Sequence, residues 1–322
     1  VYTACRRIVK KGRIVMKSAV VTGATGMIAS ALIRYLVSKN IKVYALCKPD
    51  EPKNDDFFKN PLVTAVDADI SELADADSKI PEKCDVLYHF AWLGTFGNTR
   101  DDAYTQNDNI KYTLDAVTLA HKLSCSCFVG AGSQAEYGPV KEKLTSSTPT
   151  DPCLGYGIAK LAAGKLSRIY AENLNIRHVW ARILSVYGQK GNPNAIIQST
   201  ISKLAKGEKC SFTPCEQDWD FLHCDDAARA FYLMGEKGKH GAVYPLGTGK
   251  TRKLKDYIVS LRDTVNKNAE IGIGEIPYNK NQVMYLCADI SQLTSDTGFK
   301  PEISFEEGVK ITYDWMKEHG CC

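Results

Sequence analysis

The chain has 322 residues, of which 44% are hydrophobic and 24% are charged, and its formal net charge is +4 at pH 7. This composition is ordinary for a globular protein, and the charge is too small and too dispersed to indicate binding to nucleic acid. No apolar run approaches the length of a membrane span, and the 12 cysteines lack zinc-ligand spacing. We therefore expect a cytoplasmic protein with free thiols, no metal, no nucleic-acid partner and no membrane contact.

Five basic side chains lie within the first 15 residues, which contain no apolar signal core. We expect residues 1–15 to be a disordered basic extension, and the alternative is a basic arm that binds an acidic partner. The ordered fold is then expected to begin near Met16.

Short apolar runs alternate with helical patterns along the rest of the chain. The runs that predict strands are 19–22, 42–47, 62–65, 86–90, 125–130, 177–183 and 242–246, and the helical patterns include 27–39, 106–123 and 305–319. Such alternation predicts an α/β protein with a doubly wound parallel sheet, in which ligands bind at the carboxyl ends of the strands. We expect a Rossmann-type domain over residues 16–184 and about 218–249, and a smaller mixed α/β lobe over about 185–217 and 250–318.

A glycine turn follows the first predicted strand. Gly23 and Gly26 allow a tight turn and a close backbone approach, and the helix that begins behind them offers free N–H groups to a pyrophosphate. Ala29 stands where a third glycine is usual, and it is small enough for the helix to pack closely on the strand. Directly after the first strand of an alternating pattern, this turn predicts a dinucleotide-binding site.

Tyr156 and Lys160 lie four residues apart at the predicted start of a helix, so their side chains share one helical face. A free tyrosine has a pKa of about 10, and a nearby ammonium group favours the phenolate. We therefore expect Lys160 to bring the pKa of Tyr156 toward the working range of an acid/base catalyst. A hydride-transfer enzyme needs such a group to move the proton of an alcohol oxygen.

These features, together with further motifs in the same order, resemble the extended short-chain dehydrogenase/reductase family, and within it the enzymes that act on nucleoside-diphosphate sugars. The further motifs are Asp67 with Asp69, His89-Phe90-Ala91, Asn109, Gly132-Ser133, Arg182 with Tyr187-Gly188, Asp220-Phe221 with Asp225-Asp226, and Gly298-Phe299-Lys300-Pro301. The resemblance covers about residues 17–318. It implies an NAD(P)-dependent enzyme with a nucleoside-diphosphate sugar as substrate, and it leaves open a homodimer formed through a four-helix contact, as is common in the family.

The resemblance also implies the catalytic residues. Ser133 would hydrogen-bond the reacting sugar oxygen, Tyr156 would shuttle its proton, and Lys160 would hold the nicotinamide ribose. Asn109 would support this arrangement from the neighbouring helix. The residues expected to bind the cofactor are Gly23, Thr25, Gly26, Met27, Ile28, Lys48, Asp69, Ile70, Phe90, Ala91, Tyr156 and Lys160, with Asp69 and Ile70 at the adenine ring.

The end of the second predicted strand bears on the choice of cofactor. An acidic residue there would bind both ribose hydroxyls of NAD, whereas a basic residue would favour the 2′-phosphate of NADP. This chain has Cys47 at that position and Lys48 directly after it. NADP is therefore the expected cofactor. In the alternative, Lys48 is a solvated cation, and Asp50 or another group binds the ribose of NAD.

The loop after Ser133 separates the reactions of this family. Its 4,6-dehydratases resemble one another in having an Asp-Glu pair directly after the Ser or Thr, but here Gln134 and Ala135 occupy those positions. Neither side chain transfers a proton at neutral pH, so dehydration is not expected, and Glu136 is interpreted as a structural carboxylate. A 4-keto-6-deoxy-sugar reductase that uses NADPH is the preferred interpretation. A 4-epimerase with retained NAD is the alternative, and a non-catalytic dinucleotide sensor is a remote one.

The substrate-binding residues are less well marked. Those expected to contact the substrate are Trp92, Gln134, Arg182, Asn194, Phe212 and Arg252, and segments 192–197 and 212–215 resemble stretches that lie along the nucleoside diphosphate in relatives. Trp219 stands where many relatives have an arginine, so a phosphate contact is not carried over to it. Arg252 is expected to supply a diphosphate contact instead, unless it is a solvated cation. Trp92 replaces a small residue and would either narrow the sugar pocket or simply pack.

Overall fold

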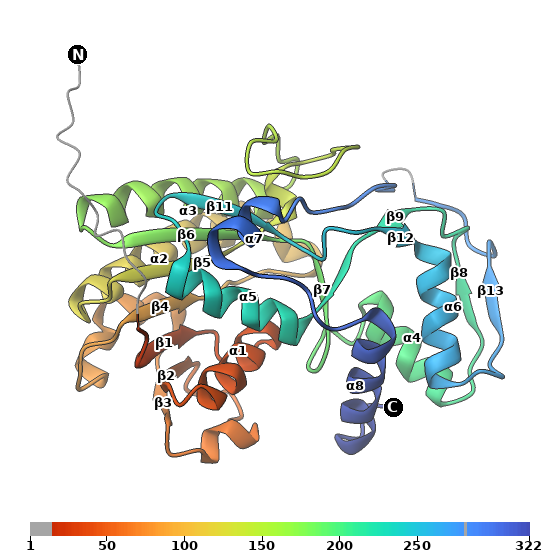
Figure 1. The fold of residues 1–322 in the computed structure, drawn as a ribbon, viewed down its shortest axis with the longest axis horizontal. Coiled ribbons are helices and arrows are strands. Elements are labelled where there is room, and N and C mark those ends of the chain that lie inside the picture. Colours follow the sequence, from red (N-terminus) through yellow and green to blue (C-terminus); the bar gives the residue numbers. More distant parts are fainter. Residues whose placement is uncertain (1–14, 280–281) are drawn as a thin grey trace.

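A seven-stranded parallel sheet forms the centre of the computed structural model, which describes residues 15–279 and 282–322 (Figure 1). Its strands are β1 (Ser18–Thr22), β2 (Lys42–Cys47), β3 (Val63–Asp67), β4 (Val86–His89), β5 (Cys127–Ser133), β6 (Arg177–Ile183) and β11 (Ala242–Leu246). Their spatial order is β11-β6-β5-β4-β1-β2-β3. Because β1 lies between β4 and β2, the direction of winding reverses there, and a crevice is expected at the carboxyl ends of β1 and β4.

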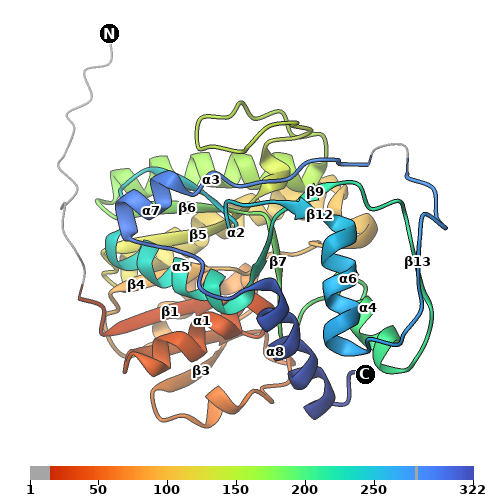
Figure 2. The same ribbon diagram turned by 45° about the vertical axis from the view of Figure 1, so that its right-hand side comes forward.

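Helices cover both faces of this sheet (Figure 2). On one face lie α1 (Met27–Ser38), α5 (Cys224–Lys237) and α7 (Ser291–Thr297), and on the other lie α2 (Ala103–Lys122), α3 (Gly155–Asn173) and the 3-10 helix η2 (Ile70–Lys79). This is the doubly wound α/β fold that the sequence predicts. No helix in the described ranges is both long enough and apolar enough to cross a membrane.

The predicted strand boundaries agree with the structure for β2, β6 and β11 and differ by one to three residues for the others. β5 continues past Gly130 to Ser133 because the pairing with β6 extends as far as Ile183. This extension places Ser133 at the carboxyl edge of the sheet. The basic extension expected at residues 1–15 lies, apart from Val15, outside the described residues.

A second group of elements packs around its own hydrophobic cluster to one side of the sheet (Figure 1). Its helices are α4 (Ile196–Ala205), α6 (Leu254–Val265) and α8 (Phe305–Glu318), and its strands are β7 (Ser185–Tyr187), β8 (Cys210–Phe212), β9 (Asp218–Trp219), β10 (Phe221–His223), β12 (Arg252–Lys253) and β13 (Ile271–Ile273), paired as three two-stranded sheets. Aromatic rings fill the centre of this cluster. The ring of Tyr257 lies 5.1 Å from that of Phe221 and 4.5 Å from that of Phe305, measured between centroids.

The position of α7 differs from the division expected from the sequence, which assigns residues 250–318 to the smaller lobe. α7 packs against α5 and β11, and Leu293 and Phe299 are buried in the core of the large sheet. The buried carboxylate of Asp226, on α5, accepts the backbone N–H groups of Glu302 and Ile303 at 2.9 Å. This contact fixes the chain as it leaves the sheet and turns toward α8.

Three glycines make room for Trp180, a fully buried side chain on β6. A Cβ atom at Gly130 or Gly132, on the neighbouring strand β5, would overlap the indole, and a Cβ atom at Gly164 on α3 would lie 2.7 Å from it. The indole therefore fills a space that only glycine leaves open between β5, β6 and α3. Its N–H donates a hydrogen bond of 2.9 Å to the carboxylate of Glu136, which lies directly behind the end of β5.

Candidate active site

The loops after β1 and β4 meet at the crevice, where Thr22 joins them. Its hydroxyl oxygen accepts hydrogen bonds from the backbone N–H groups of Phe90 and Ala91, both at 3.2 Å, and lies 2.9 Å from Nδ1 of His89. Gly23 follows with a φ of +65°, and a Cβ atom there would lie 2.9 Å from the backbone nitrogen of Ala91. The turn therefore needs glycine, both for its backbone conformation and for the close approach of the two loops.

The N-terminus of α1 faces this crevice with unused donors. Gly26 is the N-cap residue, no side chain caps the helix, and its first turn contains no acidic residue. The backbone N–H groups of Met27 and Ile28 therefore remain available to an anion. A cavity of about 310 Å³, which we call the crevice cavity, adjoins this helix end. The expected cofactor-binding residues that line it are Gly23, Thr25, Gly26, Lys48, Ile70, Phe90 and Ala91.

Two residues of opposite charge line the crevice cavity just beyond the end of β2. They are Lys48 and Glu51, whereas the side chain of Cys47 is buried in the core. Glu51, one residue beyond the Asp50 considered from the sequence, is therefore the acid that lines this part of the crevice cavity. The tight glycine turn, the open helix N-terminus and these two charges together fit a dinucleotide.

Asp69 and Asn109 bind backbone groups rather than pointing into the crevice. The carboxylate of Asp69 accepts the backbone N–H of Ser71 at 3.0 Å and caps η2, and it does not line the crevice cavity. The side chain of Asn109 is fully buried on α2, accepts the N–H of Leu93 at 2.8 Å, and donates to the carbonyl oxygens of Leu93 and Thr105. Asn109 therefore fixes the loop after β4, which is a positioning role.

Ser133 and Tyr156 meet at the carboxyl edge of the sheet, at the end of β5 and in the first turn of α3. Burial raises the pKa of Tyr156 above its ordinary value of 10.0, and a hydrogen bond with the Ser133 side chain acts in the opposite direction. The Ser133 oxygen also accepts the backbone N–H of Ala135 at 3.1 Å. The hydroxyl proton of Ser133 is therefore left for Tyr156 or for a bound oxygen atom.

Lys160, one turn further along α3, is only 4% exposed. Its ammonium group donates to the carbonyl oxygen of Ala131 at 2.7 Å and lies 3.6 Å from the centroid of the Trp92 ring. Burial lowers the pKa of Lys160 to about 7, and the negative charge of Glu136 opposes this shift. The expectation that Lys160 depresses the pKa of Tyr156 is therefore not met in this structure, because the ammonium group faces Ala131 and Trp92.

Arg100 is a cation beside Tyr156 that the sequence analysis missed. Its guanidinium carbon lies 4.7 Å from the centroid of the Tyr156 ring, and its charge opposes the effect of burial on the pKa of Tyr156. The carboxylate of Asp101 accepts the N–H of Gly155 at 2.8 Å, which fastens the 3-10 helix η3 (Gly97–Arg100) to the start of α3. Arg100 lies in a segment without periodicity, so no sequence signal marks this contact.

Trp92 separates the crevice cavity from Tyr156. It lines the cavity, and the edge of its ring meets the Tyr156 ring at a centroid distance of 6.1 Å. Its indole N–H donates at 3.0 Å to Gln106 on α2, and the Gln106 amide donates in turn to the carbonyl oxygen of Gly94. Trp92 is thus held in place between Tyr156 and Gln106.

A second cavity, of about 420 Å³, lies among the elements of the smaller cluster, and we call it the lobe cavity. It is lined by Leu184, Ser185, Val186, Tyr187, Ala195, Ile196, Ile197, Gln198, Thr213, Gln217, Trp219, Phe221, Leu254 and Gln282. It begins close to Ser133, because Ser133 pairs with Ile183 on β6 and the lining residues follow directly in the chain. The indole N–H of Trp219 donates to the hydroxyl of Ser185 at 2.8 Å inside it.

None of the six residues expected to contact the substrate lines the lobe cavity. Phe212 is buried in the hydrophobic cluster and Asn194 is exposed, although the residues that follow them, Thr213 and Ala195, do line it. Arg252 instead forms an ion pair with Glu306 at 2.8 Å, which corrects its expected role. The sequence therefore identifies the two segments but not the side chains that face the cavity.

Arg182 is the second arginine whose expected role is corrected. Its Nε donates to Oε2 of Glu136 at 2.7 Å, and both side chains are buried. The other carboxylate oxygen of Glu136 accepts the backbone N–H of Ser133 and the indole N–H of Trp180, both at 2.9 Å. Glu136 is thus the structural carboxylate that the sequence predicts, and Arg182 supports it rather than a substrate. Gln134 is half-buried in the 3-10 helix η4 (Gln134–Glu136) next to Ser133.

Comparisons with known proteins agree on one family. Residues 19–247 match the model of the NAD dependent epimerase/dehydratase family. The dTDP-D-glucose 4,6-dehydratase of Homo sapiens is 27% identical over 324 residues, which cover 94% of this chain and 91% of that protein. The UDP-glucose 4-epimerase of Thermotoga maritima, solved with UDP-glucose, has a TM-score of 0.83 at 20% identity and covers 94% of this chain and 99% of its own. The structure of a UDP-N-acetylglucosamine 4-epimerase of Methanobrevibacter ruminantium also has a TM-score of 0.83, at 24% identity. The match covers 96% of this chain and 100% of the epimerase chain.

The buried ammonium group of Lys160 gives a prediction about stability and pH. The pKa of Lys160 falls from 10.5 to about 7 on folding, so the unfolded chain binds the proton more tightly between these values. Stability therefore rises with pH across this window, and the cost of burying Lys160 is greatest near its lower end. We expect Lys160→Met to stabilise the protein more at about pH 7 than at about pH 9.5, with a difference of at least about 1 kcal/mol in the free energy of unfolding.

Urea unfolding of both proteins at the two pH values measures this difference. Lys83→Met, at an exposed lysine, serves as the control and should show no such trend. If Lys160→Met raises the free energy of unfolding by an amount that is constant or grows with pH, Lys160 keeps its ordinary pKa in the folded protein.

Proposed function

The chain belongs to the NAD dependent epimerase/dehydratase family, and we propose that it transfers hydride at C4 of a nucleoside-diphosphate sugar. The observation that carries this proposal is the meeting of Ser133 and Tyr156 at the carboxyl edge of the sheet. The crevice cavity extends as far as Trp92, whose ring contacts that of Tyr156, and the lobe cavity begins beside the pairing of Ser133 with Ile183. A dinucleotide in the first cavity and a nucleotide sugar in the second would therefore converge on Tyr156.

In this proposal the bound nicotinamide supplies or accepts the hydride, and the protein handles the proton. Tyr156 holds the proton at its phenolic oxygen, and its raised pKa keeps the phenol protonated at neutral pH, as is needed to donate to an alkoxide. Ser133 hydrogen-bonds the same sugar oxygen with the hydroxyl proton that Ala135 leaves free. The positive charge of Arg100 stabilises the phenolate that remains after proton transfer.

Dehydration does not fit the residues beside Ser133, although one relative is a 4,6-dehydratase. Gln134 and Ala135 carry no group that transfers a proton at neutral pH. The neighbouring carboxylate, Glu136, is turned away from the sugar site and accepts hydrogen bonds from Ser133, Trp180 and Arg182. We therefore retain the two reactions that move hydride at C4 without loss of water.

Reduction of a 4-keto-6-deoxy sugar by NADPH is the preferred reaction, because Lys48 lines the crevice cavity where a 2′-phosphate would lie. A 4-epimerase with retained NAD is the second candidate, supported by Glu51 in the same cavity and by the two structural neighbours named as 4-epimerases. A dinucleotide sensor without activity is disfavoured, since Ser133, Tyr156 and Lys160 are all present.

A homodimer through α2 and α3 is also part of this proposal. These two helices pack side by side, and their outer face exposes Tyr104 (85%), Ile158 (53%) and Ile169 (52%). Large apolar side chains gathered on one face commonly mark an interface.

We expect the protein to sediment as a dimer and the double variant Ile158→Asp/Ile169→Asp to sediment as a monomer, whereas Val259→Asp on α6 should leave the dimer intact. A monomeric parent protein, or a dimeric double variant, would contradict this interface.

The choice of cofactor is tested by replacing Lys48 and Glu51 separately. If Lys48 contacts a 2′-phosphate, the parent should bind NADPH more tightly than NADH, and Lys48→Ala should reduce this preference by about tenfold. If Glu51 binds the ribose hydroxyls of NAD, Glu51→Gln should instead weaken the binding of NADH and leave the binding of NADPH unchanged. Fluorescence titrations measure all four affinities, and Lys39→Ala, an exposed lysine at the end of α1, is the control. Equal affinities of the parent for both cofactors would reject the assignment to Lys48.

The direction of the reaction is tested by following nicotinamide absorbance and sugar products together. A reductase should consume NADPH in proportion to a 4-keto-6-deoxy nucleotide sugar, whereas an epimerase should interconvert C4 epimers with no net change in absorbance. Tyr156→Phe should lower turnover by about 10²-fold or more while cofactor binding persists, since it removes only the proton donor. Epimerisation without added reductant would replace the preferred reaction by the second one, and a Tyr156→Phe variant within about tenfold of the parent would show that another group is the acid.

A further inference from the structure

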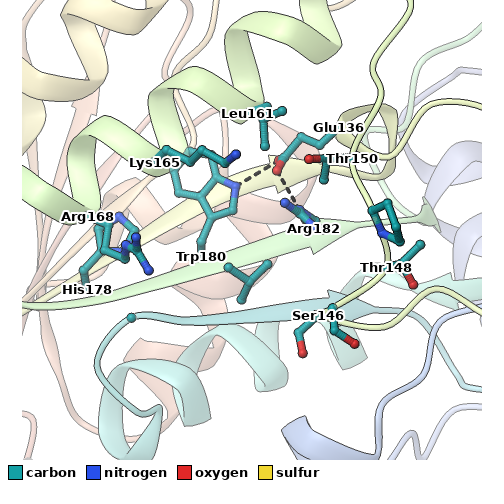
Figure 3. Close-up of a pocket in the computed structure, with 15 residues that line it drawn as sticks. Glu136, Ser146, Thr148, Thr150, Leu161, Lys165, Arg168, His178, Trp180 and Arg182 are labelled. Carbon is teal, nitrogen blue, oxygen red and sulfur yellow. Dashed lines mark hydrogen bonds and ion pairs between the residues drawn. The ribbon is translucent and has the colours of Figure 1, made fainter.

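A third cavity, of about 340 Å³, lies behind Glu136, and we call it the back cavity (Figure 3). One stripe of α3 forms its first wall through Leu161, Gly164, Lys165 and Arg168, which recur at helical spacing. The loop of residues 146–150 forms the opposite wall, and strand β6 forms the floor. The back cavity shares no lining residue with the crevice cavity or the lobe cavity.

The charged groups of the back cavity are mostly positive. Lys165, Arg168 and Arg182 face a single carboxylate, that of Glu136, so three cations against one anion leave a net charge of +2. Lys165 and Arg168 are exposed, and neither has an ion-pair partner within residues 15–279 and 282–322. A hollow surface lined by charges of one sign concentrates counter-ions. The field in this cavity therefore favours an anion.

Two polar atoms at the floor of the back cavity lack hydrogen-bond partners among the described residues. They are Nη1 of Arg182 and Nδ1 of His178, whose side chains belong to residues that are 5% and 1% exposed. Buried polar groups in proteins almost always have a partner, and Nη1 of Arg182, whose guanidinium carbon lies 4.4 Å from the centroid of the Tyr137 ring, remains a donor without an acceptor. Figure 3 shows Arg182 at the middle of the cavity and Arg168 on the same side as His178.

Apolar surface completes the lining and sets the kind of ligand. Leu161 and Val243 line the cavity together with the indole of Trp180. The volume falls at the lower end of the range of about 300–1,000 Å³ that is typical of small-molecule sites. A bare inorganic ion would leave the apolar part uncovered, whereas a small organic anion would cover both kinds of surface.

We propose that the back cavity binds a small organic oxyanion, either a phosphate ester or a carboxylate. Its charged group lies among Lys165, Arg168 and Arg182, and its organic part lies against Leu161 and the Trp180 indole. This site is distinct from the proposed nucleotide-sugar site and does not depend on it. Because Glu136 accepts the backbone N–H of Ser133 as well as the Nε–H of Arg182, an anion bound at Arg182 acts on the group that positions Ser133.

The indole N–H of Trp180 offers a local probe for this site. The chain contains four tryptophans, so protein labelled with ¹⁵N-tryptophan gives few indole signals, and Trp180→Phe identifies the one that reports on the back cavity. Phenyl phosphate and benzoate represent the two anion classes, and benzyl alcohol is the neutral control. We expect saturable shifts of the Trp180 signal with at least one of the two anions and none with the alcohol.

Removal of the two exposed cations should weaken this binding. The double variant Lys165→Gln/Arg168→Gln is expected to bind the anion about tenfold or more weakly. The control Lys83→Gln/Lys267→Gln, with two exposed lysines elsewhere, should match the parent, and the oligomeric state of all variants is checked by sedimentation. Whichever of phenyl phosphate and benzoate binds more tightly identifies the charged group of the ligand as a phosphate or a carboxylate. An unmoved Trp180 signal, an equal response to benzyl alcohol, or undiminished binding in Lys165→Gln/Arg168→Gln would overturn the proposal.

Discussion

The buried carboxylate of Glu136 is the interaction on which the geometry of the site depends. A buried charge is costly unless it is paired and hydrogen-bonded, and Glu136 meets this condition through three donors, one at the end of β5 and two on β6. The backbone N–H of Ser133 fixes the end of β5, the Trp180 indole occupies the glycine-lined space, and the Arg182 guanidinium closes the rear. Loss of the carboxylate would leave all three donors unpaired at once. The backbone of Ser133 is therefore held by a carboxylate that is itself held by Trp180 and Arg182.

The protonation states of Lys160 and Tyr156 depend on burial, and a bound ligand can change them. Burial favours a neutral Lys160 near pH 7 and a protonated Tyr156, so it disfavours a charge on either group. Lys160 rests on Trp92 and Ala131, and Arg100 is the cation whose charge acts on the phenol. A hydroxyl-bearing ligand placed between Trp92 and Tyr156 would give the Lys160 ammonium new acceptors and favour its charged form.

The sequence predicts the sheet and the glycine turn well because each depends on local pattern. Buried strands such as β2 and β11 appear as short, mostly apolar runs, and a positive φ at Gly23 follows from its place after β1. The sequence shows a charge but not its partner, so it predicts substrate contacts for Arg182 and Arg252, although each pairs with a glutamate in the fold. Arg100 was missed for the same reason, since its contact with Tyr156 joins segments that no local pattern connects.

The smaller hydrophobic cluster draws its residues from Tyr187 through Met316, and the ring of Phe305 on α8 packs 5.3 Å from that of Tyr187. Because a chain leaves the ribosome from its N-terminus, this cluster cannot close until α8 has been synthesised. The strands around the crevice, β1 to β4, are complete much earlier. The apolar side of α4 is therefore exposed on the nascent chain until α8 has been made. For that interval the growing chain offers chaperones a hydrophobic surface that the finished molecule hides.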